Sequence, residues 1–416
     1  MNRIYSVVIA LLLCISASPA AANEPKDLTL EQAATFALEK NPDLQTLRLE
    51  EGSAKGLNER ARLLLINNPV IEGNVSKKDR PDEEGGGKFT NYGFKLSQEF
   101  EIAGQRGARI DVAEKEVARL KSEIRDRERI LISDVKDAFT KALSLKKKSG
   151  LAREIVNLQE ELLGYTKIKF QAGDVSGLDV NLAEVELSKA KKELLLAQRE
   201  YRESLLVLQG LIGLPPDMSF AIQGDLPSEV PQLPDRDALK ILALSYRPDS
   251  KASVFEMERT ESALKLVKKE AFPNITLSGF YERDERRNVA GLEVSIPLPF
   301  FDRKQAEKRE AFAKAEGAKI KAAGLKKSIE REVDQAFNDI TSAIEELSLF
   351  RKEILVKAAE NLELLNLAFK EGKIGFFEVR FAQKDTIEAQ FAYIDAQTRT
   401  QLALNAIEKI TGGAVK

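Results

Sequence analysis

The chain is poor in the residues on which most catalytic and metal chemistry depends. It has 416 residues, no histidine and no tryptophan, and its single cysteine, Cys14, lies in an apolar segment near the N-terminus. Outside that segment, disulfide bonds, thiolate or imidazole metal ligation and histidine acid–base catalysis are therefore excluded. These absences argue against an enzyme, and we expect neither a cofactor nor a resident metal ion.

Proline is missing from two long stretches. All 14 prolines lie outside residues 82–214 and 300–416, so each of these ranges can be helical throughout. Charged residues make up 31% of the chain and aromatic residues 6%, a balance that suits exposed helices and coiled coils. The 64 basic and 66 acidic side chains give a net charge of −2, which offers no electrostatic basis for binding nucleic acid.

The first 22 residues have the pattern of an export signal peptide. Arg3 supplies the positive start, residues 4–17 form a short apolar segment, and alanines 20–22 form a small-residue cleavage site. The alternative, a membrane anchor helix, is disfavoured because a span needs about 20 apolar residues. Leu13 is larger than the residue that normally precedes a lipidated cysteine. We therefore do not expect lipidation of Cys14, although the pattern leaves it open.

The rest of the chain contains one pattern written twice. The sequence DVKDAF at residues 134–139 recurs as EVDQAF at 332–337, and FQAGDV at 170–175 recurs as FKEGKI at 369–374. After each of the two glycines, alanines recur at every seventh position: Ala183, Ala190 and Ala197, then Ala382, Ala389, Ala396 and Ala403. Repeats of this length indicate duplicated modules rather than a short-period solenoid.

We predict two modules after the signal peptide, one over residues 23–212 and one over 237–416. Between them, residues 213–236 hold five prolines, too many for a helix interior, and are interpreted as a strap across the outside of the molecule. Each module is expected to contain a hairpin of strands, at about 69–100 and 273–298, and a helical tip, at about 171–178 and 370–377.

The hairpins leave two interpretations open. Apolar and polar residues alternate over about ten residues between long polar turns, as in the strands of a membrane β-barrel. A soluble hairpin with one wet face has the same periodicity. Two hairpins make four strands, which are too few to close a barrel, so the membrane interpretation requires several chains to share one barrel.

Long helices are expected on either side of each tip. Residues 104–171 contain no proline over 68 positions, and apolar residues in this range have coiled-coil spacing. At the rise of an α-helix, this length spans roughly 100 Å. A shorter return helix, from residue 178 to about 211, covers only half of it.

Two segments carry a resemblance to a known family. QEFEIAGQR at residues 98–106 follows the first hairpin, and PLPFFDRKQ at 297–305 follows the second. With the paired glycine turns and the proline break before each hairpin, they resemble the TolC family of outer-membrane efflux channels, and in particular its heavy-metal branch of the Czc/Cus type. The resemblance covers essentially the whole chain after the signal peptide.

The resemblance implies a mainly α fold with a smaller β part. Long antiparallel coiled-coil helices would form an α-barrel in the periplasm, and three chains would each give four strands to one twelve-stranded membrane β-barrel. No tryptophan is present for an aromatic girdle at the edges of this barrel. Other aromatic residues would have to serve: Phe89, Tyr92, Phe94, Phe272, Phe280 and Tyr281.

The function implied is that of a passive outer-membrane conduit in a tripartite efflux pump. Its cargo would be heavy-metal cations, and its partners a second and third copy, outer-membrane lipid, a periplasmic membrane-fusion adaptor and an RND-type inner-membrane transporter. One alternative is a duct of the same family for organic compounds such as drugs. A less favoured one is a periplasmic coiled-coil adaptor or scaffold, since no lipoyl-like module is found.

The helical tips are the expected contacts with the adaptor. Gly173 and Gly372 would each end a helix in the left-handed conformation, a role they would play in any helical hairpin. Leu178 and Phe377 follow the two turns and would be apolar contacts for the adaptor. Packing within each hairpin is the alternative for these two side chains.

The resemblance also places a gate near the tips. Asp179 and Glu378 occupy equivalent positions, and threefold symmetry would turn them into rings of carboxylates that favour cations. The alternative is ordinary helix capping and compensation of the helix dipole. Arg380 would tether the closed state to a neighbouring chain. Phe381 stands where relatives can place another acidic residue, which weakens the ring hypothesis.

Overall fold

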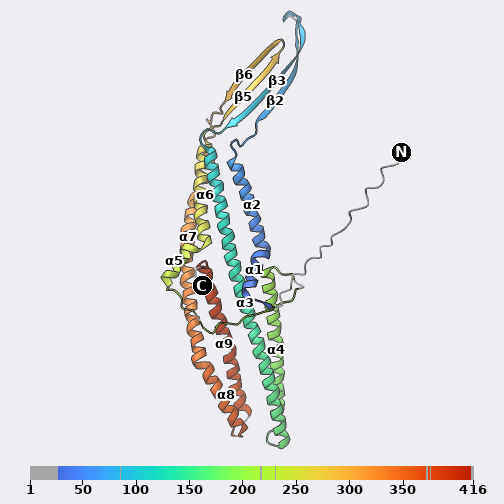
Figure 1. The fold of residues 1–416 in the computed structure, drawn as a ribbon, viewed down its shortest axis with the longest axis vertical. Helices are drawn as coiled ribbons and strands as arrows, with labels where there is room; N and C mark the ends of the chain where they lie inside the picture. The colour runs from blue at the N-terminus through green and yellow to red at the C-terminus, as the bar shows by residue number, and fades with distance from the viewer. Residues whose placement is uncertain are drawn as a thin grey trace, which may run out of the picture.

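The computed structural model is an elongated molecule with a sheet at one end and helical hairpins at the other (Figure 1). It describes residues 27–84, 86–215, 218–229, 231–371, 373–374 and 376–413; for residues 84, 366, 369, 370 and 376–379 only the backbone is described. The predictions of a signal peptide and of an unlipidated Cys14 lie outside the described residues.

The described part of the chain begins with a short strand, which is followed by two helices separated by a proline break. These are β1 (Asp27–Leu28), α1 (Leu30–Lys40) and α2 (Pro42–Arg62). The side chain of Asn41 accepts a hydrogen bond from the backbone of Leu44 at 3.1 Å and so caps α2, while Pro42 occupies the first helical turn.

Helix α2 ends at Arg62, although the sequence contains no helix breaker before Asn67-Asn68-Pro69. The carbonyl oxygens of Arg62 and Leu63 accept hydrogen bonds from the guanidinium of Arg106, at 2.8 and 3.2 Å. A side chain from another helix thus satisfies terminal carbonyls that would otherwise require a further helical turn. The sequence could not show this contact.

Four antiparallel strands form one sheet, in the order β2-β3-β5-β6. They are β2 (Val70–Arg80), β3 (Gly87–Phe100), β5 (Ile275–Asp284) and β6 (Arg287–Ser295). A short 3-10 turn, η1 (Asp82–Glu84), lies between β2 and β3. The middle pair, β3 and β5, comes from the two halves of the chain. The outer edges of β2 and β6 have no strand partner among the described residues.

Helices make up most of the molecule. They are α3 (Gln105–Ala172), α4 (Gly177–Ile212), α5 (Arg236–Tyr246), α6 (Pro248–Glu270), α7 (Gln305–Leu349), α8 (Leu355–Lys370) and α9 (Phe376–Ile410). Helix α3 packs against α2 and α6 on the side of the sheet and against α4 and α9 toward the tips (Figure 1). The predicted 68-residue helix is confirmed in α3.

The second long helical range is not one α-helix. A single π turn, η2 (Phe350–Ile354), separates α7 from α8. Within this turn the guanidinium of Arg351 donates a hydrogen bond to the backbone oxygen of Ser228, at 3.1 Å, in the segment that connects α4 to α5. The absence of proline correctly predicted helix, but it could not predict a change of hydrogen-bond pattern within it.

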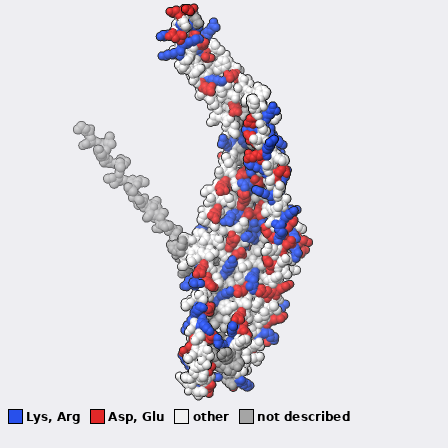
Figure 2. All heavy atoms as spheres, turned by 180° about the vertical axis from the view of Figure 1, so that it is seen from behind, with Lys and Arg blue, Asp and Glu red and all other residues white. Residues whose placement is uncertain are grey.

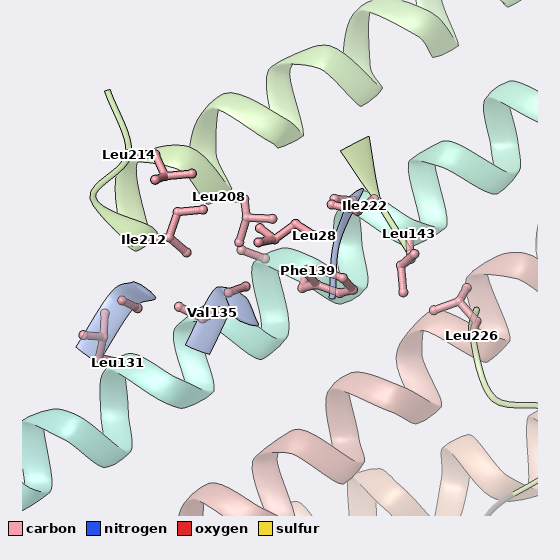
Figure 3. Close-up of a cluster of buried hydrophobic side chains, with 14 of the residues drawn as sticks. Leu28, Leu131, Val135, Phe139, Leu143, Leu208, Ile212, Leu214, Ile222 and Leu226 are labelled. Carbon is pink, nitrogen blue, oxygen red and sulfur yellow. The ribbon is translucent and has the colours of Figure 1, made fainter. Parts of the chain in front are cut away.

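The main core lies where β1 and α1 meet α3, α4 and the segment that connects α4 to α5. Strand β1 pairs in parallel with β4 (Ala221–Ile222), so Leu28 and Ile222 lie side by side. Both are fully buried against Val135 of α3 and Leu208 of α4 (Figure 3). Burying each such aliphatic side chain contributes roughly 1.5–3 kcal/mol. A smaller cluster forms around α5, α7 and α9.

In both halves of the chain, a glycine with a positive φ ends the return helix and lies close to the backbone of another helix. Gly213 follows α4 with a φ of +69°, and a Cβ placed there would lie 2.8 Å from the carbonyl oxygen of Lys40. Gly412 follows α9 with a φ of +70°, and its Cβ would lie 3.1 Å from the carbonyl carbon of Tyr246. In each half, the return helix therefore ends against the helix that precedes a proline break.

Candidate functional site

The sheet has one apolar and one polar face. Alternation places most of the large apolar side chains of the four strands on the same side, where they are exposed. We call the turns between β2 and β3 and between β5 and β6 the distal turns. Figure 2 shows, from behind, that charged side chains gather at the distal turns and on the helices, with a largely uncharged band between them. The large exposed residues of this apolar face are Ile71, Val75, Phe94, Leu96, Leu277, Tyr281, Leu292 and Val294.

The opposite face carries polar and charged groups that bond across strands. The ammonium group of Lys95 contacts the carboxylate of Glu293 at 2.9 Å, and the hydroxyl of Ser278 donates to that of Ser97 at 2.9 Å. Nearer the distal turns, the amide of Asn91 donates to Asp284 at 2.7 Å. This face is suited to line an aqueous space, and the apolar face is suited to contact lipid.

The register corrects part of the predicted aromatic girdle. Tyr92, Phe94 and Tyr281 lie on the apolar face, but Phe89 and Phe280 lie on the polar face with Lys95. Phe280 covers the backbone of its cross-strand partner on β6, Gly291, where an added Cβ would lie 2.8 Å from the ring. The alternation of residues in β5 already indicated that Phe280 lies on the face opposite Tyr281. The prediction of the aromatic girdle did not use this alternation.

The first helical tip has the predicted left-handed glycine. Gly173 has a φ of +86°, and the backbone N–H of Asp174 donates to the carbonyl oxygen of Lys169 at 2.9 Å, which closes the end of α3. Leu178 lies just after the turn and is 66% exposed. Intramolecular packing within the described residues therefore leaves its surface available.

Asp179 takes part in a capping box at the start of α4. Its carboxylate accepts hydrogen bonds from the hydroxyl of Ser176, at 2.7 Å, and from the backbone N–H of that residue, at 2.9 Å. The backbone N–H of Asp179 in turn donates to the Ser176 hydroxyl. These bonds lower the pKa of Asp179, so the carboxylate is charged at neutral pH. Capping accounts for the residue in one chain, and its gate role remains a prediction.

The second tip repeats part of the same geometry. The backbone N–H of Lys373 donates to the carbonyl oxygen of Ala368 at 2.9 Å, at positions equivalent to those of Asp174 and Lys169. Gly372 and the side chains of Phe377 and Glu378 lie outside the described residues. Their predicted roles in adaptor contact and gating remain predictions.

Arg380 joins the two helical hairpins of the same chain. Its guanidinium bonds to the carboxylate of Glu186 on α4, at 2.5 Å. The sequence hypothesis gave Arg380 a partner in a neighbouring chain and did not single out Glu186. The internal duplication could have indicated Glu186, because this residue corresponds to Asp385 when the two series of alanines are aligned. Both acids lie seven residues after the predicted gate carboxylates.

A hollow of about 1290 Å³ lies between α3, α6 and α7. Five basic and six acidic side chains line it, and four of the five cations have carboxylate partners. Arg119 bonds to Glu116 at 2.7 Å, and Arg259 bonds to Glu256 at 2.8 Å. The guanidinium groups are therefore held by local carboxylates, and this wall has no strong excess of one charge.

Two features are absent from the described ranges of the chain. No group of three or more histidine, cysteine, aspartate or glutamate side chains in these ranges is placed to hold a metal ion. Among the same residues, no helix combines the length and apolar character needed to cross a membrane.

The chain combines a sheet that has one apolar and one polar face with long helices that end in two hairpins. This combination is typical of a channel protein. The chain belongs to the outer membrane efflux protein family, whose model matches residues 35–214 and 241–413. Members of this family, the TolC family, are non-enzymatic channels that form trimers and work in tripartite pumps. The chain is accordingly a bacterial outer-membrane efflux channel with a periplasmic helical extension.

Individual relatives agree with this assignment. The chain is 25% identical to the cobalt-zinc-cadmium resistance protein CzcC of Cupriavidus metallidurans, over 92% of this chain and 90% of the relative. It is 22% identical to the pyoverdine export outer membrane protein OpmQ of Pseudomonas aeruginosa, over 68% and 61%. The structure of the outer-membrane channel OprN shares the fold, with a TM-score of 0.77, 20% identity and coverage of 92% and 90%.

Proposed function

We propose that this channel is the outer-membrane conduit of a tripartite pump that exports heavy-metal cations. The similarity to CzcC over nearly the whole of both chains is the observation that carries this proposal. The channel would act without chemistry of its own, while an RND-type inner-membrane transporter supplies energy and selects the cargo. A duct that releases cations needs no resident ligands, so specificity would reside in that transporter.

Three copies of this chain would pool their strands in one membrane barrel. Among the residues that the structure describes, β2 and β6 have no strand partner at their outer edges, and the apolar face of the sheet is exposed. Open strand edges cannot remain in lipid, where every backbone polar group requires a partner. Pairing β6 of one chain with β2 of the next satisfies both edges and directs the polar faces inward.

The entrance would lie at the helical tips, in contact with a periplasmic adaptor. Leu178 and its equivalent in the second tip, Phe377, would provide apolar contacts, beside the turns at Gly173 and Gly372. Asp179 and Glu378 would each form a ring of three carboxylates that attracts cations. The bond between Arg380 and Glu186 would hold the two hairpins together in the closed state. We also propose that residues 213–236 divide two TolC-like repeats.

The metal proposal is tested with a strain that lacks this gene. We expect hypersensitivity to zinc, cobalt, cadmium, copper or silver salts, and restoration by the complete gene. Growth in dyes and antibiotics is measured in parallel. Sensitivity to organic compounds alone would reassign the cargo, an alternative supported by the similarity to OpmQ, whose name describes pyoverdine export. The family assignment leaves the adaptor or scaffold hypothesis without support.

The gate proposal is tested in planar lipid bilayers. Arg380→Ala and Glu186→Ala should each raise the open probability of the reconstituted channel, because either change releases one hairpin from the other. Lys384→Ala is the control, since the ion pair between Lys384 and Glu388 lies within α9. Equal open probability in all three variants and the unmodified channel would contradict the gate role.

A further inference from the structure

A belt of exposed apolar side chains lies at the junction between the sheet and the helices. We call residues 60–69, 99–109, 268–274 and 296–309 the junction collar; they contain the four connections between the four-stranded sheet and the helices. Each connection exposes large apolar side chains, including Phe301 at 95%, Leu64 at 78% and Leu298 at 68%. The others are Leu63, Leu65, Phe100, Ile102, Phe272, Ile296 and Phe300.

The same collar carries an excess of positive charge. Its four segments contain ten basic and five acidic side chains, a net charge of +5 in a chain whose overall net charge is −2. Helix ends concentrate this charge at the helical border of the collar: Lys268 and Lys269 at the end of α6, and Arg303, Lys308 and Arg309 at the start of α7. The positive charge therefore lies directly beside the apolar belt.

Several of these cations contact backbone carbonyl groups and no carboxylate. Lys269 donates to the oxygen of Gly104 at 3.0 Å, Lys308 to that of Arg303 at 2.8 Å, and Arg303 to that of Pro299 at 3.3 Å. Across the described ranges, none of these three cations forms an ion pair, whereas the nearby Lys304 pairs with Glu307 at 2.9 Å. Their charge is thus left for a partner outside the chain.

Continuity with the lipid-facing sheet identifies the partner. The collar lies at the helical end of the sheet, where Phe100 continues the apolar face of β3. The turns between paired strands, at the other end of the sheet, carry mixed charges (Figure 2). An apolar band bordered by lysine and arginine matches the boundary of a bilayer, where acyl chains meet phosphate groups. Basic residues near an anionic membrane surface are attracted to it electrostatically.

We propose that the junction collar binds the periplasmic leaflet of the outer membrane and prefers anionic phospholipid there. Phe301, Leu298 and their neighbours enter the acyl region, and Lys269, Arg303 and Lys308 contact lipid phosphates. The collar thereby sets the depth of the channel in the bilayer. This inference rests on the outer-membrane placement of the protein and is independent of its cargo, so the metal-sensitivity experiment leaves it unaffected.

The lipid preference is measured on the reconstituted full-length channel. Spin-labelled phosphatidylglycerol and phosphatidylcholine are compared in vesicles of dioleoyl-phosphatidylcholine, and the fraction of each motionally restricted by the protein gives the relative affinity. We expect a preference for phosphatidylglycerol of roughly threefold or more at low salt, which falls as sodium chloride is added. A preference unaffected by salt, or none, would overturn the proposal.

A charge-matched pair of variants locates the preference. The collar variant combines Lys269→Gln, Arg303→Gln and Lys308→Gln, since glutamine can still donate to the backbone carbonyls. The control combines Lys326→Gln, Lys327→Gln and Arg331→Gln, three exposed positions of α7 below the collar. The collar variant should lose the preference and the control should retain it. An equal loss in both would show a nonspecific effect of net charge and overturn the proposal.

Immersion of the belt is measured separately. The chain has no cysteine after Cys14, so a nitroxide can be attached at Phe301→Cys or, as a control, at Ile320→Cys, an exposed apolar position further along α7. In vesicles, position 301 should be accessible to oxygen and protected from a water-soluble nickel complex, with the reverse at 320. Position 301 protected from both reagents would instead place the belt between neighbouring chains, and the proposal would be wrong.

Discussion

At the scale of single residues, the most constrained charge belongs to Arg247. Its side chain is 6% exposed and lies at the proline break between α5 and α6. The guanidinium bonds to Asp249 at 2.6 Å, within the first turn of α6, and to Glu332 of α7 at 2.6 Å. In the first half of the chain, the corresponding break is capped by Asn41. Arg247 therefore replaces a local cap with a link between helices.

Replacing Arg247 should destabilise the periplasmic helices. Arg247→Gln leaves Asp249 without its cation, and losing one member of a buried ion pair costs about 3 kcal/mol. Urea unfolding of the purified protein in detergent, followed by circular dichroism, measures the change. Arg199→Gln is the control, because its pair with Glu203 is well exposed and should contribute less than about 1 kcal/mol. Similar losses in both variants would contradict the role assigned to Arg247.

The same pair predicts how stability depends on pH. Burial alone would raise the pKa of Asp249, but the hydrogen bonds and charge of Arg247 outweigh it and hold the pKa below its ordinary value of 3.8. A lowered pKa stabilises the fold above the unfolded value, and that stability is lost as the pH falls through the folded value. The free energy of unfolding should therefore drop more steeply below pH 4 in the unmodified protein than in Arg247→Gln. Parallel curves would show that the pair contributes nothing.

At the scale of secondary-structure elements, two glycines determine where the return helices stop. Both Gly213 and Gly412 have positive φ, and both approach the backbone at the end of another helix. A side chain at either position would force a residue other than glycine into a positive φ, which is strained. Its Cβ would also lie too close to the backbone of the neighbouring helix. These glycines therefore connect helix termination to packing in both halves of the chain.

Alanine substitution tests this role with a control in the same helix. Gly213→Ala and Gly412→Ala should each lower the free energy of unfolding by 1 kcal/mol or more, roughly the cost of a left-handed residue. Gly210→Ala should instead be neutral or stabilise by up to about 1 kcal/mol, because that helical glycine has open space around it. Thermal melts in detergent compare the three. A stabilising Gly213→Ala would contradict the packing argument.

At the scale of the whole molecule, the outer edges of β2 and β6, which have no strand partner in the described part of the chain, lie on opposite sides of the sheet (Figure 1). Such an arrangement joins copies head to tail and ends when the ring closes. A bismaleimide should cross-link neighbouring chains of the double variant Val75→Cys, Leu292→Cys, with one cysteine on each edge strand. Electrophoresis should show dimers and trimers and no larger species. Either single variant should remain monomeric, and dimers from a single variant would contradict the head-to-tail arrangement.

Much of the fold follows from local patterns. Proline-free ranges and coiled-coil spacing predicted α3, and alternation predicted the sheet and its two faces. The missed features all depend on contacts between distant segments. Arg106 ends α2 early, the π turn meets the connecting segment through Arg351, and Glu186 lies opposite Arg380. Side chains distant in sequence carry no local signal of such contacts.

The order of residues along this chain was enough to exclude histidine and cysteine chemistry, to reveal the duplication and to place helices and strands, because each depends on residue type and near neighbours. Packing in three dimensions decided which strand edges stay open, how Asp179 is held and where unpaired cations meet exposed apolar residues. Those properties arise when remote segments approach one another, since only then do burial, charge and hydrogen bonding act between them.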